Sequence, residues 1–192
     1  MKHLISLFDL TKDDVDQIFE IAFDVKKLHQ NGERPSRLQN KLLTQIFDKP
    51  SLRTRLSFEA SLVQLGGAST FMTSQEAGLQ GRESLQDVAR VISAYSDAVV
   101  IRTFSHELIE NFAKYSSCPV INGLSDDKHP CQALTDLFTM IELFGTLTNQ
   151  RLVYIGDGNN VAASLVIGCT MFDLPVTICT PNGYELDTAF LK

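Results

Sequence analysis

The stretch LLTQIFDKPSLRTRLSFE, residues 42–59, joins an apolar run to an arginine-rich segment through a lysine–proline turn. The run LLTQIF is typical of a buried strand, and the proline stands where a turn leads into a helix. The first helical turn then contains two guanidinium groups and two hydroxyls: Ser51, Arg53, Thr54 and Arg55. Because N–H groups at a helix start, the helix dipole and arginine all favour anions, this turn predicts a phosphate site. A solvated, well-capped helix start is the alternative.

Length and composition indicate a globular protein without a general affinity for polyanions. A chain of 192 residues that is 44% hydrophobic can bury one full core and part of a second. The net charge is −6, so no general attraction to nucleic acid or to an anionic membrane is expected. Any anion site must therefore be local.

The four cysteines, at positions 118, 131, 169 and 179, are widely spaced and form no C-x-x-C pair. They are typical of reduced thiols in a cytoplasmic protein. The four histidines show no metal-ligand spacing, which disfavours a metal site. The N-terminal segment becomes acidic too early for a signal peptide, and no apolar run approaches the length of a membrane span. The predicted location is the cytoplasm.

Strands alternate with helices along the first 145 residues. A helix opened by Thr11 is expected to end near Gln30, and the helix after Pro50 is expected to stop at Gly66. Further helices are predicted over 84–95 and 105–115, and strands over 42–47, 68–73, 97–102 and 118–122. This alternation predicts an α/β fold with a mostly parallel sheet covered on both faces.

A long apolar helix over 131–145 precedes a second strand–helix–strand pattern. Apolar residues surround most of that helix, which predicts burial between two layers or two domains. The second pattern comprises a strand over 151–156, a helix over 161–172, a strand over 176–180 and a turn, PNGYE, into a last helix. One helix cannot cover both faces of a sheet. We therefore expect a first domain at 1–145 and the start of an incomplete second α/β domain at 146–192.

Polar side chains follow successive predicted strands, where open α/β sheets bind ligands. Besides the first-turn residues described above, they are Arg82, Arg102, Asn122, His129 and Gln132. Taken singly, Arg102 fits a surface salt bridge and His129 a structural histidine; their joint placement favours a site. The set lacks a nucleophile–base pair but is rich in donors. Such donors suit a reaction in which a bound phosphate leaves, negative charge grows on a carbonyl oxygen and the substrate's own amine attacks.

The segment GDGNNVA, residues 156–162, partly matches a dinucleotide-binding fingerprint. Val161 stands where the third small residue belongs, and Thr180 rather than an acid ends the next strand, which argues against a nicotinamide cofactor. Asn159 and Asn160 then either contact a polar substrate or cap the helix.

Five motifs together resemble the aspartate/ornithine carbamoyltransferase family. They are SLRTR at 51–55, Arg102 after a strand, HPCQAL at 129–134, GDGNN at 156–160 and TPNGYE at 180–185. Their order and spacing agree along essentially the whole chain. HPCQ combined with GDGNN and TPNGYE favours the ornithine-specific over the aspartate-specific branch.

The resemblance implies a site for carbamoyl phosphate in the first domain. Its phosphate would be held by Ser51, Arg53, Thr54 and Arg102. Its carbonyl would be polarised by Thr54, Arg102 and His129, with Gln132 taking the carbamoyl amide. The uncharged side-chain amine of L-ornithine would attack and phosphate would leave, giving citrulline as in arginine biosynthesis.

The resemblance further implies that Asn160 contacts the backbone groups of ornithine, that no metal or organic cofactor is needed, and that the protein is a homotrimer with sites near subunit boundaries. Two features depart from the family pattern. Leu52 replaces a more usual threonine, and neither Gln75 nor Gln80 matches the glutamine that the family donates to a neighbouring subunit.

Family members continue well beyond residue 192 with segments that hold ornithine. The resemblance therefore implies a C-terminally incomplete chain with little or no transferase activity by itself. Two alternatives stay open: a non-catalytic carbamoyl-phosphate-binding fragment, and a carbamoyltransferase for another amine such as acetylornithine, putrescine or aspartate.

Overall fold

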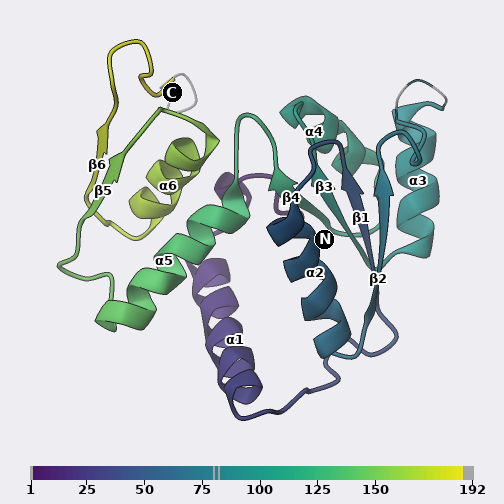
Figure 1. Ribbon diagram of the computed structural model, residues 1–192, viewed down its shortest axis with the longest axis horizontal. Coiled ribbons are helices and arrows are strands. Elements are labelled where there is room, and N and C mark those ends of the chain that lie inside the picture. Colours follow the sequence, from purple (N-terminus) through teal and green to yellow (C-terminus); the bar gives the residue numbers. More distant parts are fainter. Residues whose placement is uncertain (1, 80, 82, 188–192) are drawn as a thin grey trace.

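The computed structural model describes residues 2–79, 81 and 83–187. Strands and helices alternate along the chain as predicted (Figure 1). The helices are η1 (Leu7–Asp9), α1 (Lys12–Gln30), α2 (Leu52–Gln64), α3 (Leu85–Tyr95), α4 (His106–Tyr115), α5 (Pro130–Phe144) and α6 (Asn160–Met171). The strands are β1 (Leu42–Phe47), β2 (Ala68–Thr73), β3 (Ala98–Arg102), β4 (Val120–Leu124), β5 (Leu152–Ile155) and β6 (Val176–Cys179).

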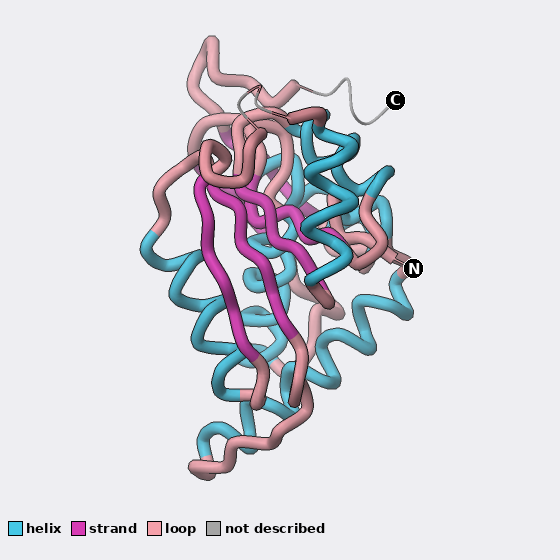
Figure 2. Tube along the Cα trace, turned by 90° about the vertical axis from the view of Figure 1, so that its right-hand side faces the viewer, coloured by secondary structure: helices cyan, strands magenta, loops and turns pink. Residues whose placement is uncertain are grey.

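The first sheet is parallel and has the strand order β2-β1-β3-β4. The N-terminal segment extends it beyond β4, because the Leu4 N–H donates to the Val120 carbonyl (2.8 Å) and the Asn122 N–H to the Leu4 carbonyl (2.8 Å). Figure 2 shows the strands side by side, with loops gathered beyond one end. Parallel strands place all their carboxyl ends at one edge, so the segments that follow β1, β3 and β4 meet there.

Helices cover both faces of this sheet, as predicted. Alternate residues of β3 divide between the faces: Val99 and Ile101 pack with α3 and α4, whereas Val100 packs with α2. All three side chains are fully buried. The α/β prediction with a parallel sheet is therefore confirmed.

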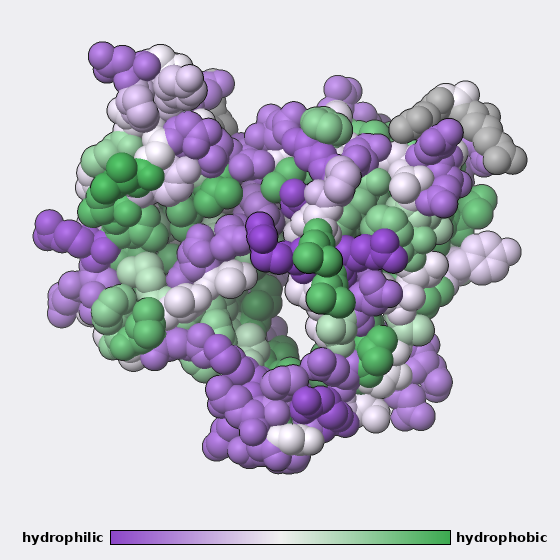
Figure 3. Space-filling model, viewed as in Figure 1, coloured by the Kyte–Doolittle hydropathy of each residue, from purple (hydrophilic) through white to green (hydrophobic). Residues whose placement is uncertain are grey.

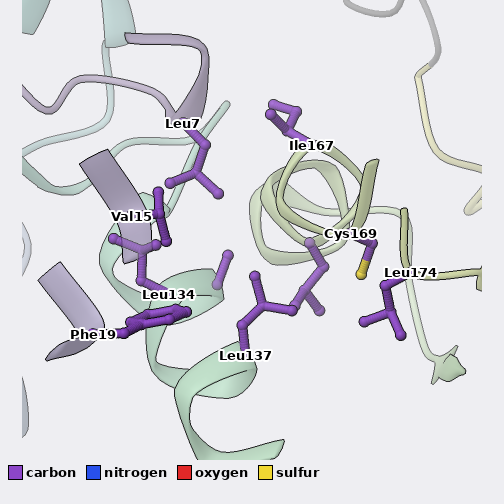
Figure 4. Packing of buried hydrophobic residues seen from close by; sticks show 10 residues of the cluster. Leu7, Val15, Phe19, Leu134, Leu137, Ile167, Cys169 and Leu174 are labelled. Carbon is purple, nitrogen blue, oxygen red and sulfur yellow. The ribbon is translucent and has the colours of Figure 1, made fainter. Parts of the chain in front are cut away.

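A third core joins α1, α5 and α6, away from the sheet. Figure 4 shows Leu137 of α5 pointing towards α6, with Phe19 of α1 beside Leu134. Gly168 of α6 lets the two helices approach, since a Cβ there would lie 2.9 Å from a methyl of Leu137. Residues from both sides of the expected domain boundary thus share one core. One side of α5 stays exposed at Thr135 and Thr139, and so does its last turn, as at Leu143.

The second unit consists of β5 and β6, paired in parallel, with α6 beside them (Figure 1). Val153 and Ile155 of β5 are 54% and 82% exposed. The last helix predicted after PNGYE does not begin within residues 184–187, and the remaining residues of that prediction, 188–192, lie outside the described part of the chain. Within the described residues, no helix is both long and apolar enough to cross a membrane.

Candidate active site

A cleft of about 870 Å³ opens at the carboxyl edge of the first sheet, between α2 and α5 (Figure 3). The elements that bound it are α1, most of α2, the end of β3, the end of β4 and the start of α5. Six of the predicted site residues line it: Ser51, Arg53, Thr54, Arg102, His129 and Gln132. The fold therefore brings residues from three separate segments to one place.

The start of α2 supplies hydroxyls and a free guanidinium. Ser51 is the N-cap, and its hydroxyl accepts a bond from the Thr54 N–H (3.4 Å) while donating to the Thr54 hydroxyl (2.9 Å). Arg53 is exposed and makes no hydrogen bond or ion pair with another described residue. The first-turn N–H groups, the positive helix end and this guanidinium make the turn suited to an anion.

Arg102, the last residue of β3, reaches the same turn. Its Nη1 donates to the Thr54 hydroxyl at 3.5 Å, although the two residues are 48 positions apart. Its Nε is buried and has no hydrogen-bond partner within the described residues. Burial lowers the pKa of the guanidinium, which nonetheless remains charged at neutral pH. A half-buried cation with an unused N–H is stabilised by an anionic ligand.

His129 occupies the N-cap position of α5, but its side chain makes no capping bond. Its Nδ1 is buried without a hydrogen-bond partner in the described part of the chain. Burial, and then the nearby Arg102 charge, lower the pKa of the imidazole to about 4. The ring is therefore neutral at pH 7 and can donate one N–H to a ligand without carrying a charge.

This pKa predicts a pH-dependent stability. Because the folded-state pKa lies below the ordinary value of 6.5, the unfolded chain binds more protons between about pH 4 and pH 6.5. The free energy of unfolding should fall as the pH is lowered through that window, and His129→Gln should reduce the fall. Urea unfolding of both proteins at pH 7 and pH 5 measures this fall in the free energy of unfolding. His3 and His106, whose pKa values burial also lowers, stay in both proteins, so identical pH slopes for the two would contradict the assignment to His129.

Gln132 and Cys131 follow His129 on the first turn of α5. The Gln132 amide donates to the Asp136 carboxylate (2.9 Å), whose pKa is raised by burial. The Cys131 thiol donates to the Asn122 carbonyl (3.6 Å), and burial raises its pKa to about 12. A thiol that stays protonated at neutral pH is no nucleophile.

Three further predicted residues, Arg55, Asn122 and Asn160, lie outside the cleft lining, and Asn122 is fully buried. Arg55 is turned to the far side of α2, where it pairs with Glu59 (3.5 Å) and stacks over the Phe71 ring (3.7 Å). Asn160 opens α6 and donates to the Ser125 carbonyl (2.5 Å); it faces a separate, smaller depression of about 360 Å³. The loop predictions at Gln80 and Arg82 fall outside the described residues, and Gln75 is exposed.

Sequence reasoning missed the contacts that hold the site loops together. The Thr103 hydroxyl donates to the Asp48 carboxylate (2.6 Å). Lys49 forms an ion pair with Asp126 and lies 4.2 Å from the centroid of the Phe104 ring. The only local sign of these contacts is the charged pair Asp48–Lys49 before Pro50, and the sequence pattern identified that segment simply as a turn.

The GDGNN loop is filled by the chain itself. The Gly158 N–H donates to the Tyr184 carbonyl (2.8 Å), and a Cβ at Gly158 would lie 2.3 Å from the Leu186 backbone nitrogen. This glycine therefore makes room for the chain, not for a pyrophosphate. Among the described residues, no group of three or more His, Cys, Asp or Glu could hold a metal ion.

Comparison with protein-family models matches nearly the whole chain. Residues 2–142 match the carbamoyl-P binding domain of aspartate/ornithine carbamoyltransferase, and residues 148–192 match the Asp/Orn binding domain of the same family. The chain belongs to the aspartate/ornithine carbamoyltransferase family.

Relatives within the carbamoyltransferase family cover this chain almost completely. The ornithine carbamoyltransferase of Anoxybacillus flavithermus is 44% identical over 191 residues, which are 100% of this chain and 61% of that protein. The solved ornithine carbamoyltransferase of Pyrococcus furiosus superposes with a TM-score of 0.95 at 43% identity, over 99% of this chain and 61% of its own.

The catalytic subunit of M. jannaschii aspartate transcarbamoylase superposes with a TM-score of 0.87 at 33% identity, over 100% of this chain and 64% of its own. The chain thus spans less than two thirds of the length of each of these carbamoyltransferases.

Proposed function

We propose that this chain carries the carbamoyl phosphate site of an ornithine carbamoyltransferase, an enzyme that moves the carbamoyl group to the side-chain amine of ornithine and releases citrulline and phosphate. One observation carries the proposal: Arg102 and His129 both line the cleft at the start of α2, and each has a buried nitrogen without a hydrogen-bond partner among the described residues. The membership of the family and the names of its ornithine-specific members support it.

In this proposal the phosphate is bound by Ser51, Arg53, Thr54 and Arg102. Arg53 is available for this role because it has no other partner among the described residues. The two hydroxyls are already within hydrogen-bonding distance of each other, and Arg102 reaches Thr54, so the donors converge before the ligand arrives. Converging donors need little rearrangement when charge develops on the departing phosphate.

The carbonyl of the ligand is polarised by Thr54, Arg102 and His129, and Gln132 binds its amide. A neutral imidazole donates a hydrogen bond to the carbonyl oxygen without adding a second positive charge beside Arg102. The uncharged amine of ornithine then forms the new C–N bond, and the bond from carbon to the phosphate oxygen breaks. Positioning and electrostatic stabilisation account for the chemistry, and no metal or organic cofactor is required.

We assign residues 1–145 to the carbamoyl phosphate domain and 146–192 to the start of the acceptor domain, with Asn160 contacting the backbone groups of ornithine. Its place beside the smaller depression at the start of α6 supports this role. Aspartate is the second candidate acceptor, because the chain also superposes on the M. jannaschii aspartate transcarbamoylase subunit.

We further propose a cytoplasmic homotrimer that acts in arginine biosynthesis. The outer surface of α2 supports assembly, since Leu52, Leu56 and Val63 are 80%, 58% and 61% exposed. Sedimentation equilibrium that returned only a monomer at micromolar concentration would count against the trimer.

Calorimetric titration with carbamoyl phosphate, followed by ornithine or aspartate, tests the function. Binding of carbamoyl phosphate is the expected result. Phosphate release on adding ornithine would establish transfer by this chain, and release with aspartate alone would change the acceptor. Binding of carbamoyl phosphate without turnover would indicate the non-catalytic fragment. A chain that binds no carbamoyl phosphate would refute the proposed site.

A further inference from the structure

The loop that carries His129, residues 125–129, is held at both ends by helix α6 of the second unit. At one end, Asn160 Nδ2 donates to the Ser125 carbonyl at 2.5 Å. At the other end, the His129 backbone N–H donates to Ser164 Oγ at 2.8 Å, although the two residues are 35 positions apart. The Ser164 hydroxyl in turn donates to the Asn160 carbonyl at 2.8 Å, so the two anchors are themselves connected.

The serine side of each anchor is buried. Ser164 is 1% exposed and Ser125 is fully buried, whereas His129 and Asn160 are half-buried. A backbone N–H that packing removes from most of the solvent needs a partner, and the buried Ser164 hydroxyl supplies it for His129. Within the first unit, Asn122 Nδ2 also supports the loop through the Lys128 carbonyl (3.3 Å), but this bond does not reach His129 itself.

His129 depends on this backbone bond more than an ordinary N-cap residue does. Its side chain makes no capping bond and its Nδ1 has no partner within the described residues. The direction of the imidazole is therefore set by the backbone from which it starts. A small displacement of that backbone would move the ring relative to Arg102 and Thr54, and catalytic geometry tolerates little such displacement.

We propose that Ser164 is a positioning residue for His129, and that the N-terminal part of α6, from Asn160 to Ser164, sets the geometry of the carbamoyl phosphate site from the opposite side of the expected domain boundary. Ser164 does not line the cleft; it acts only through the His129 backbone. The inference rests on the proposed function in one respect, namely that His129 contacts the ligand.

A matched control separates positioning from simple loss of stability. Ser93 of α3 is 4% exposed, and its hydroxyl accepts a bond from the Ser117 backbone N–H at 2.9 Å. Like Ser164, it is a buried serine whose hydroxyl accepts from the backbone N–H of another segment, but it does not line the cleft. Ser164→Ala and Ser93→Ala each remove one buried hydroxyl and leave one backbone N–H of another segment without its acceptor.

The experiment compares both variants with the unmodified 192-residue chain. Carbamoyl phosphate affinity is measured by calorimetry, and the imidazole signals are followed by NMR of 15N-histidine protein, with His129→Gln used to assign the His129 signals. We expect Ser164→Ala to weaken affinity by about tenfold and to move the His129 signals, because the imidazole is no longer held in place. Ser93→Ala should lower the unfolding midpoint comparably and change neither readout.

Unchanged His129 signals and affinity in Ser164→Ala, or equal changes in both variants, would overturn the inference. If Ser164→Ala does not fold, Ser164→Cys keeps the side-chain volume with a weaker acceptor and should move the His129 signals in the same direction. Unmoved His129 signals in Ser164→Cys would also overturn the inference. Absence of carbamoyl phosphate binding in the unmodified chain would contradict the proposed function instead, while the imidazole signals would still decide whether Ser164 positions His129.

Discussion

Replacing Arg102 by methionine is expected to weaken carbamoyl phosphate binding by about a hundredfold or more. The guanidinium lines the cleft, its Nη1 donates to the Thr54 hydroxyl, and its buried Nε has no hydrogen-bond partner among the described residues. Removing one partner of a desolvated, charge-assisted contact costs about 2–5 kcal/mol of binding free energy. Calorimetry with carbamoyl phosphate, and with inorganic phosphate as the simpler anion, measures the loss.

The same substitution should raise the unfolding midpoint of the ligand-free protein. Arg102 is partly desolvated and pairs with no carboxylate of the described residues, whereas a methionine of similar length fills the space at no electrostatic cost. Opposite changes in stability and affinity are the mark of a binding residue. Arg55→Met is the matched control: Arg55 belongs to the same SLRTR motif but pairs with Glu59 and Phe71, so affinity should stay within about twofold. An Arg102→Met protein that binds as tightly as the control would refute the role of Arg102.

Leu137→Ala is expected to lower the free energy of unfolding by about 2–5 kcal/mol, as for other buried leucines in tightly packed cores. Leu137 is fully buried between α5 and α6 and lies against Gly168, which leaves little room for the neighbours to collapse into the cavity. Because that core also contains residues of α1, both units should lose stability together. Urea denaturation followed by circular dichroism provides the measurement.

Leu143→Ala, one and a half turns further along α5, provides the comparison. Leu143 is 72% exposed, so its truncation should change stability by no more than about 0.5 kcal/mol. Two separate unfolding transitions, only one of them shifted by Leu137→Ala, would show that the units fold independently. A Leu137→Ala effect as small as that of Leu143→Ala would show that the α1–α5–α6 core contributes little.

The elements of the fold were predictable because their signals are local. Thr11 and Asp14 form the expected capping box: the Asp14 N–H donates to the Thr11 hydroxyl (3.2 Å) and the Thr11 N–H to the Asp14 carboxylate (2.8 Å). Gly145 ends α5 in the left-handed conformation, with φ of 76°. Both motifs depend on residues within one helical turn, so the sequence pattern is sufficient to predict them.

Helical periodicity could also have decided which arginine of the SLRTR motif lies in the candidate site. Arg53 and Arg55 stand two positions apart on one helix, and a step of 100° per residue turns them to nearly opposite sides. Only Arg53 lines the cleft, as that geometry requires. The motif SLRTR grouped the two arginines, but helical geometry separates them.

Residues close together along the chain thus specify the caps, the alternation of strands and helices, and the carboxyl edge at which the polar side chains gather. Ser164, by contrast, looks like a helix interior residue in an apolar segment, and its bond to His129 exists only because α6 packs across α5. The shared α1–α5–α6 core, and the Arg102 and His129 nitrogens that find no partner in the described part of the chain, likewise arise from segments that meet only in the folded protein. Local hydrogen bonds and side-chain periodicity act over a few residues, whereas burial depends on which surfaces come together. Only the packed structure therefore shows the role of Ser164, the shared core and the buried nitrogens.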